Sequence, residues 1–84
     1  MTKPRRIYER LLSGARPVLS FRDFERLLAA FGFSLDRTVG SHRHYVHPRV
    51  PRSFPIQAHG KDAKRYQVAQ FLDLVEEYGL HIGE

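Results

Sequence analysis

The chain has 84 residues, of which 42% are hydrophobic and 27% charged, and its formal net charge is +5 at pH 7. This length suits one small domain, residues 1–84, with a modest core, and no apolar stretch approaches the ~18 residues needed to span a bilayer. Because there is no cysteine, disulfides and cysteine-ligated metal sites are excluded, and with no secretory signal visible we expect a cytoplasmic protein without membrane contact.

The first predicted helix covers residues 4–13. Its apolar side chains recur at helical spacing and form one stripe: Ile7, Tyr8, Leu11 and Leu12. Pro4 suits a first helical position, and Gly14 suits the end of a helix. A helix this short is marginal by itself in water, so we expect it to pack on the core. Residues 1–19 are therefore predicted to be an N-terminal helix and linker ahead of a core at 20–80.

A second helix is predicted for residues 20–31. Its apolar face is rich in aromatic side chains that we assign to the core: Phe21, Phe24, Leu27, Leu28 and Phe31. Ser20 can cap this helix, with Asp23 as its capping-box partner three residues later. Gly32 can adopt the left-handed conformation that ends a helix, which lets Phe33 fold back onto it.

Alternation of polar and apolar residues predicts a hairpin after this helix. Residues 33–39 have the pattern of a half-buried strand. Gly40 and Ser41 make the turn, and residues 42–47 return as the second strand of an antiparallel pair.

The remaining elements complete an α+β order. We expect a six-residue loop at 48–53 and a third strand at 54–58, with Pro55 favouring a sheet edge because it lacks an N–H. A polar, basic connection leads to a last helix at 64–78, which ends at Gly79. Its buried stripe is Val68, Phe71, Leu72, Val75 and Tyr78.

Charge is distributed unevenly along the chain. Residues 37–65 hold seven basic residues and one acid, whereas the residues after 65 hold four acids and no Lys or Arg. Lys61, Lys64 and Arg65 gather at the start of the last helix, where the helix dipole favours acids instead. Cations beside exposed helix N–H groups bind anions well, so we predict a phosphate-binding corner. The alternative is a solvated surface that serves only solubility.

The segment 39–47 carries three of the five histidines. A metal site at His42 and His44 is disfavoured by the surrounding positive charge, so we expect no metal and no other cofactor. RNA cleavage without metal needs a base for the ribose 2′-OH proton, an acid for the leaving 5′-oxygen, and cations for the developing charge. His42, next to Arg43, supplies these residue types. His44 and His47 are interpreted as ordinary surface residues.

Three segments of the chain resemble the HicA toxins, the mRNA interferase partners of HicB antitoxins. They run from Ser20 to Phe33, from Gly40 to Tyr45 and from Gln57 to Leu80, and Arg37 also matches. The Gly-Ser-His element at 40–42 is short, but it is specific when two such helices flank it.

This resemblance implies a fold like that of double-stranded-RNA-binding domains, with a three-stranded antiparallel sheet backed by two helices. The predicted order agrees, with an extra short N-terminal helix. The resemblance also implies ribosome-independent mRNA cleavage with His42 as the catalytic residue, and inhibition by a HicB-like antitoxin that covers the active face. We expect a monomeric free toxin that forms a hetero-oligomer with its antitoxin. Many members have Pro-x-His where this chain has Gln57-Ala58-His59, so His59 is only a candidate second catalytic group.

Three hypotheses follow from these residues. The leading one is a toxin endoribonuclease in which His42 is catalytic. Its RNA-binding residues would be Arg37, Ser41, Arg43, Lys61, Lys64 and Arg65. The second is a non-catalytic RNA-binding module of the same fold, with salt-sensitive affinity. The third is a protein-interaction domain whose basic face meets an acidic partner.

Overall fold

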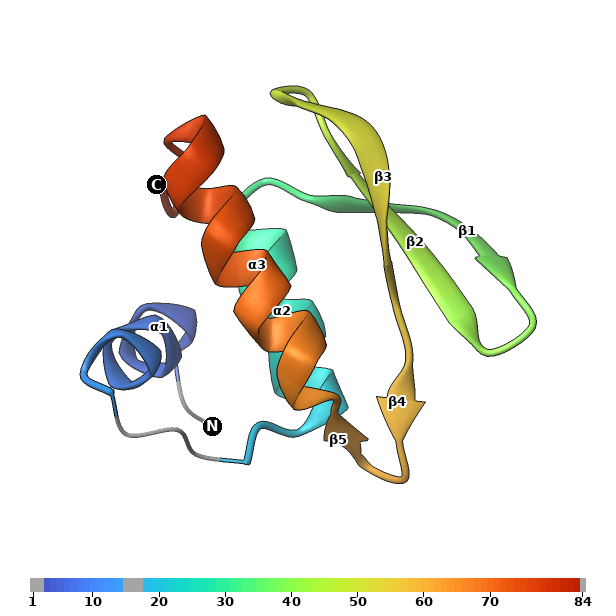
Figure 1. The fold of residues 1–84 in the computed structure, drawn as a ribbon, viewed down its shortest axis with the longest axis horizontal. Helices are drawn as coiled ribbons and strands as arrows, with labels where there is room; N and C mark the ends of the chain where they lie inside the picture. The colour runs from blue at the N-terminus through green and yellow to red at the C-terminus, as the bar shows by residue number, and fades with distance from the viewer. Residues whose placement is uncertain (1–2, 15–17, 84) are drawn as a thin grey trace.

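Helices and two antiparallel sheets succeed one another in the computed structural model, which describes residues 3–14 and 18–83 (Figure 1). The elements are α1 (Pro4–Leu12), α2 (Phe21–Ala30), β1 (Ser34–Val39), β2 (His42–His47), β3 (Val50–Ile56), β4 (Ala58–His59), β5 (Asp62–Ala63) and α3 (Arg65–Tyr78). Strands β1, β2 and β3 form one antiparallel sheet in that order, and β4 pairs with β5 in a small hairpin. Residues 15–17 of the predicted linker lie outside the described residues.

The helices form a layer on one side of the three-stranded sheet. Figure 1 shows α2 and α3 between the sheet and α1. The short first helix docks through aromatic contact, since the rings of Tyr8 and Phe31 lie 4.9 Å apart in an edge-on arrangement. These elements confirm the predicted α+β fold, with a three-stranded antiparallel sheet, two backing helices and an additional N-terminal helix.

The core between the layers is built around phenylalanines. Phe71 of α3 meets Phe24 and Phe31 of α2 edge-on, at centroid distances of 5.8 and 5.2 Å. Phe33 and Phe54 extend this cluster to the sheet. All five rings are buried. Edge-on aromatic pairs contribute about 0.5–1.5 kcal/mol each beyond the area that they bury, so this cluster fixes the sheet on the helices.

Local capping chemistry sets the helix ends, but the predicted capping box of α2 is only half formed, because the Asp23 carboxylate bonds to Arg26 instead of the Ser20 backbone N–H. The Ser20 hydroxyl accepts a hydrogen bond from the Asp23 backbone N–H at 3.1 Å. Gly32 has a φ of 94°, and the N–H of Phe33 then bonds back to the carbonyl of Leu28 at 3.0 Å. The Asp23 carboxylate accepts from Arg26 at 3.1 Å. The helix boundaries therefore follow from residues within a few positions of each end.

The prediction of a loop at 48–53 is wrong. The structure has a two-residue turn there, and β3 begins at Val50 and ends at Ile56. The cause lies in the edge position of β3, because an edge strand tolerates prolines whose nitrogen points away from its neighbour. The residues that follow β3 form the β4–β5 hairpin, which replaces both the end of the predicted third strand and part of the predicted connection.

The prediction of a half-buried first strand is also wrong. Every residue of β1 is exposed, including Leu35 at 47% and Val39 at 55%. An irregularity in the pairing with β2 between Leu35 and Arg37 shifts the alternation of side chains. Strand β1 is also the edge furthest from α3, and the β1–β2 hairpin projects away from the helices (Figure 1). The sequence of β1 alternates between polar and apolar residues, but no layer of the described residues covers the apolar side.

Candidate active site

The turn between β1 and β2 presents His42 to solvent. Gly40 has a φ of 60°, a conformation that favours glycine, and Val39 pairs with His42 directly after the turn. The imidazole is exposed. His42 therefore lies where a substrate can reach it.

Successive residues of β2 point to opposite faces of the sheet. Tyr45 and His47 face the helices, since they bond to Glu25 and to the carbonyl of Phe31. His42 and His44 consequently share the outer face. His44 lies between Arg37 and Pro55 in the pairing, and its Nδ1 is shielded without a hydrogen-bond partner among the described residues.

A chain of hydrogen bonds joins this turn to the start of α3. The Ser41 hydroxyl accepts from the amide nitrogen of Gln57 at 2.7 Å. The amide oxygen of Gln57 accepts from the Lys64 ammonium at 2.8 Å. The backbone N–H of Gln57 donates to the side-chain oxygen of Gln67 at 2.9 Å, and Gln67 is buried. The structure thus connects two predicted RNA-binding residues, Lys64 and Ser41, through Gln57, and Ser41 directly precedes His42.

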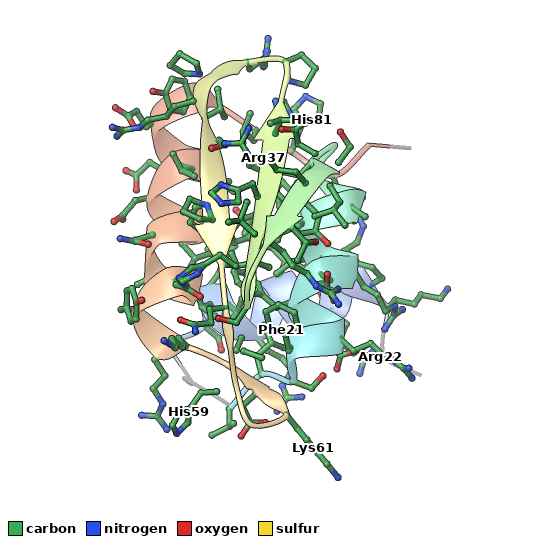
Figure 2. All side chains as sticks on the ribbon, turned by 90° about the vertical axis from the view of Figure 1, so that its right-hand side faces the viewer. Phe21, Arg22, Arg37, His59, Lys61 and His81 are labelled. Atoms are coloured by element: carbon green, nitrogen blue, oxygen red, sulfur yellow. The ribbon has the colours of Figure 1, made fainter. Side chains whose placement is uncertain are left out.

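The β4–β5 hairpin carries Lys61 of the predicted phosphate-binding corner and the candidate second catalytic group, His59, whereas Arg65 is the first residue of α3. His59 and Lys61 are exposed on it and lie together at one end of the molecule (Figure 2). A shallow depression there is lined by Val18, His59, Asp62, Ala63, Lys64, Arg65 and Tyr66. We call this surface, together with Lys61, the cationic corner. The N–H of Phe21 bonds to the carbonyl of Lys61 at 2.8 Å, which fixes the hairpin against the start of α2.

The N-terminus of α3 opens into the cationic corner. Lys64 occupies the N-cap position and makes no side-chain capping bond, and the first turn contains no acid. Serine, threonine, asparagine or aspartate would normally satisfy an N–H group at such a position. The first N–H groups of the helix and the nearby cations are therefore available to an anion.

Arg43 and Arg37 lie apart from this corner. Arg43 donates to the Glu25 carboxylate at 2.6 Å and stacks over the ring of Phe21, with 5.6 Å to its centroid. The same carboxylate accepts from Tyr45 at 2.6 Å. This group clamps β2 to α2 on the inner side. Arg37 lies towards the other end of the sheet from His59 (Figure 2).

The clamp changes the ionisation of its members. The Glu25 carboxylate raises the pKa of Arg43 through their hydrogen bond and their charges. Burial, followed by the bond to Glu25, raises the pKa of Tyr45 to about 12. Both groups therefore keep their protons at any physiological pH. The cluster thus has a structural role and does not take part in acid–base chemistry.

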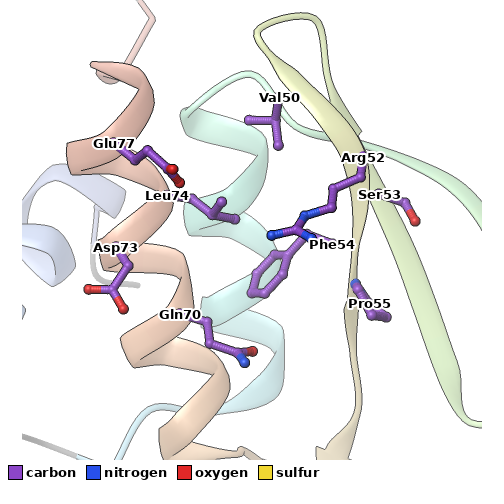
Figure 3. Close-up of a pocket in the computed structure, with 9 residues that line it drawn as sticks. All are labelled: Val50, Arg52, Ser53, Phe54, Pro55, Gln70, Asp73, Leu74 and Glu77. Carbon is purple, nitrogen blue, oxygen red and sulfur yellow. The ribbon is translucent and has the colours of Figure 1, made fainter.

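A second depression lies between β3 and α3, and Figure 3 shows its lining. Its volume is about 480 Å³, and its lining residues are Val50, Arg52, Ser53, Phe54, Pro55, Gln70, Asp73, Leu74 and Glu77. It contains none of the predicted site residues, and its two acids face a single cation. An anionic substrate fits the cationic corner better.

The description "HicA toxin of bacterial toxin-antitoxin" belongs to a family model that matches residues 21–76, well over half of the chain. The chain belongs to the HicA toxin family. The matched segment starts at the first residue of α2 and includes the sheet, the His42 turn and every residue of the cationic corner except Val18. Neither the curated proteins nor the solved structures gave a significant match.

Membership makes this HicA protein a toxin of a toxin–antitoxin system, and it implies a cognate antitoxin as partner. Helix α1 precedes the matched segment. In the part of the chain that the structure describes, no helix is long and apolar enough to cross a membrane. No group of three or more His, Asp or Glu side chains in the same residues is placed to hold a metal ion.

Several residues around the HicA site were not predicted. Gln57 and Gln67 connect the turn to α3, although the signal for Gln67 was present as a polar residue beside the apolar stripe. His47 was interpreted as an ordinary surface residue, but its ring is fixed: Nε2 lies 2.9 Å from the carbonyl of Phe31, and Nδ1 accepts from the Arg49 N–H at 3.0 Å. His47 is therefore a structural residue of the sheet.

Proposed function

We propose that this HicA-family toxin is an endoribonuclease that cleaves mRNA without a metal ion, with His42 as general base or general acid. The proposal is supported by the exposed imidazole of His42, which directly follows Ser41 in the chain, and by the hydrogen bonds that join the Ser41 hydroxyl through Gln57 to the Lys64 ammonium. A base removes the ribose 2′-OH proton, the 2′-oxygen attacks the adjacent phosphorus, and an acid protonates the departing 5′-oxygen. Histidine can serve in either role near neutral pH.

The cationic corner would hold the phosphates. Lys64, Lys61 and Arg65 surround the start of α3, whose first N–H groups favour an anion. Positive charge beside the phosphorus stabilises the charge that develops during attack. Ser41 and Arg37 add contacts along the outer face of the sheet, and the bond of Arg43 to Glu25 supports a positioning role for that residue.

His59 is the candidate second group. It lines the same depression as Lys64 and is exposed. A histidine on each side of a bound phosphate would divide the base and acid roles between two side chains.

A HicB-like antitoxin would inhibit the toxin by covering the His42 face. The chain would then act as one domain spanning residues 1–84, monomeric when free and hetero-oligomeric with its antitoxin in the cytoplasm. The exposed sheet face with His42 and Arg37 offers a surface that such a partner can cover.

Cleavage of single-stranded RNA in EDTA tests the proposal. The wild-type protein should cleave, and His42→Ala should lose about 10²–10⁴-fold in rate because one proton-transfer group is gone. His81→Ala is the matched control, since His81 is also exposed but lies at the opposite end from the cationic corner (Figure 2). Absence of cleavage by the wild type, or full cleavage by His42→Ala, refutes the catalytic role.

A non-catalytic RNA-binding module is the second candidate. The open start of α3 and its cations favour RNA phosphates whether or not His42 moves a proton. Salt-sensitive RNA binding by the wild type, with no cleavage and no effect of His42→Ala on binding, would support this alternative.

A further inference from the structure

Tyr66 is an aromatic side chain that the core does not use. The six phenylalanines and four tyrosines all lie in the described residues, and Tyr66 is the one among them that is exposed, at 58%. It occupies the second position of α3, while the buried stripe of that helix lies at Val68, Phe71 and Val75. Packing among the described residues therefore does not account for an aromatic ring at this position.

The surroundings of Tyr66 are those of a polyanion site. The Lys64 ammonium lies 6.0 Å from the centre of the ring. Tyr66, Lys64, Arg65 and His59 line the same shallow depression, and Val18, which is 60% exposed, borders it. The phenol oxygen accepts a long hydrogen bond of 3.4 Å from the amide of Gln67. The ring is thus held beside the cations with much of its surface open.

A flat aromatic surface next to cations is how proteins bind single strands of nucleic acid. The cations neutralise phosphates, and each ring stacks on a base that is not paired. In a duplex the bases are already stacked on one another, so a surface tyrosine has no free base to cover. A lone Lys–Tyr contact on a protein surface does not require a ligand, but here it lies at the corner that the proposed function assigns to RNA.

We infer that Tyr66 stacks on an unpaired base of the RNA substrate, next to the phosphate bound at Lys64. This inference rests on the proposed function and names the form of its substrate, a single-stranded segment. The stacked base would also set the register of cleavage. Lys64 contacts the Tyr66 ring on one side and Gln57 on the other, and Gln57 reaches the Ser41 turn that precedes His42. A base fixed at Tyr66 therefore selects which ribose lies at His42.

Binding of a short single-stranded RNA to the His42→Ala protein separates this inference from catalysis. In that background Tyr66→Ala should weaken binding about 5- to 150-fold, which corresponds to a stacking free energy of about 1–3 kcal/mol per base. Tyr66→Phe keeps the ring and should bind like the parent, whereas Tyr66→Leu keeps apolar bulk without an aromatic face and should bind weakly. Because the Tyr66 ring is exposed and the bond that its hydroxyl accepts from Gln67 is long, thermal unfolding should change little in all three.

Two further measurements identify stacking as the cause. Replacing one nucleotide at a time by an abasic ribose should weaken binding strongly at one position, and Tyr66→Ala should abolish that positional effect. Tyr66→Ala should also leave the slope of log K against log salt unchanged, whereas Lys64→Ala should reduce it by about 0.7 for a single strand.

Each result decides between the two proposals. Equal RNA affinity of the parent and Tyr66→Ala overturns the stacking inference and leaves the nuclease proposal intact. If Tyr66→Phe loses as much RNA affinity as Tyr66→Ala, the stacking inference is also overturned, because the hydroxyl rather than the ring would then bind the RNA. If the parent protein has no RNA affinity at all, both the stacking inference and the nuclease proposal are overturned. If that protein then forms a tight complex with the antitoxin, and the complex needs Tyr66, the ring belongs to the interface with the protein partner.

Discussion

The two ends of α3 differ in whether another element compensates for the charges and backbone groups that are exposed there. Each end carries charges that the helix dipole disfavours, with Lys64 and Arg65 at the start and acids towards the end. Each misplaced exposed charge costs about 0.3–1 kcal/mol. At the C-terminal end another element compensates, since Arg49 donates to the carbonyl of Gly79 at 3.3 Å. At the N-terminal end, Lys64 makes no capping bond and the first turn has no acid.

Of the two ends of α3, only the start is therefore left open for a ligand. A stable protein gains nothing from cations at an uncapped helix start, whereas an RNA-binding protein gains an anion site. Substitutions at the two ends test this difference.

Removing the cation at the start of α3 should have the largest effect on activity. Lys64→Ala should lower kcat/KM for RNA cleavage about 10²-fold, because one preorganised donor to the developing charge is lost. Arg49→Ala removes a cation from the other end and should leave kcat/KM within about twofold. Similar losses in the two variants would show that net charge, rather than the position of the cation, determines activity.

Gln67 tests the buried connection between α3 and the sheet. Gln67→Leu should lower the free energy of unfolding by about 1–3 kcal/mol, because the N–H of Gln57 loses its partner. Gln70→Leu changes an exposed glutamine of the same helix and should stay within about 0.5 kcal/mol of the wild type. Urea unfolding measures both, and an equal effect of the two substitutions would contradict the role assigned to Gln67.

A normal N-cap on α3 should raise the stability of the protein and remove its activity. Lys64→Asp places a capping acid where the backbone already has an extended N-cap conformation, with a φ of –72° and a ψ of 131°. We expect about 0.5–1 kcal/mol of added stability in urea unfolding, together with loss of RNA cleavage. A less stable variant would mean that Lys64 is needed for folding, and the comparison of the two helix ends would then fail.

The reverse change of charge at the other end should affect stability alone. Glu76→Lys places a cation near the C-terminus of α3, where the dipole favours it, and should add about 0.3–1 kcal/mol. Cleavage should be unchanged because Glu76 does not line the cationic corner. A fall in kcat/KM for this variant would place part of the RNA site on the acidic half of the helix.

The clamp on β2 should weaken at high pH. The pKa of Tyr45 is raised to about 12 in the folded protein from an ordinary value of 10.0. Its stabilising contribution is therefore present below pH 10 and is lost as the pH rises from 10 towards 12. Tyr45→Phe should remove this pH-dependent loss in urea unfolding, and an unchanged pH profile would show that another group titrates.

The sequence predicted those features that depend on neighbours along the chain. The cap at Ser20 and the ends at Gly32 and Gly79 use partners within five residues, and the structure has all three. The Gly40–Ser41 turn and the hairpin follow from equally local chemistry.

Features that depend on distant partners could not be predicted. Arg43 bonds to Glu25, which is 18 residues away, and Gln57 joins Ser41 across 16 residues. Strand β3 was partly missed because its prolines are tolerated only at an edge, and the position of the edge is set by the whole sheet. Similarly, the pattern in β1 predicts a buried face, but no helix covers that strand.

Cleavage of an RNA with a single 2′-deoxy nucleotide at the cleaved position tests whether the ribose 2′-oxygen attacks the phosphorus. The proposed mechanism requires the 2′-oxygen of that nucleotide as nucleophile, with its proton transferred through His42. It therefore predicts that the wild-type protein, in EDTA, cleaves the all-ribose strand to a 2′,3′-cyclic phosphate and a 5′-hydroxyl and leaves the substituted bond intact. Cleavage of the substituted bond, or equal cleavage of the all-ribose strand by His42→Ala, would contradict the account.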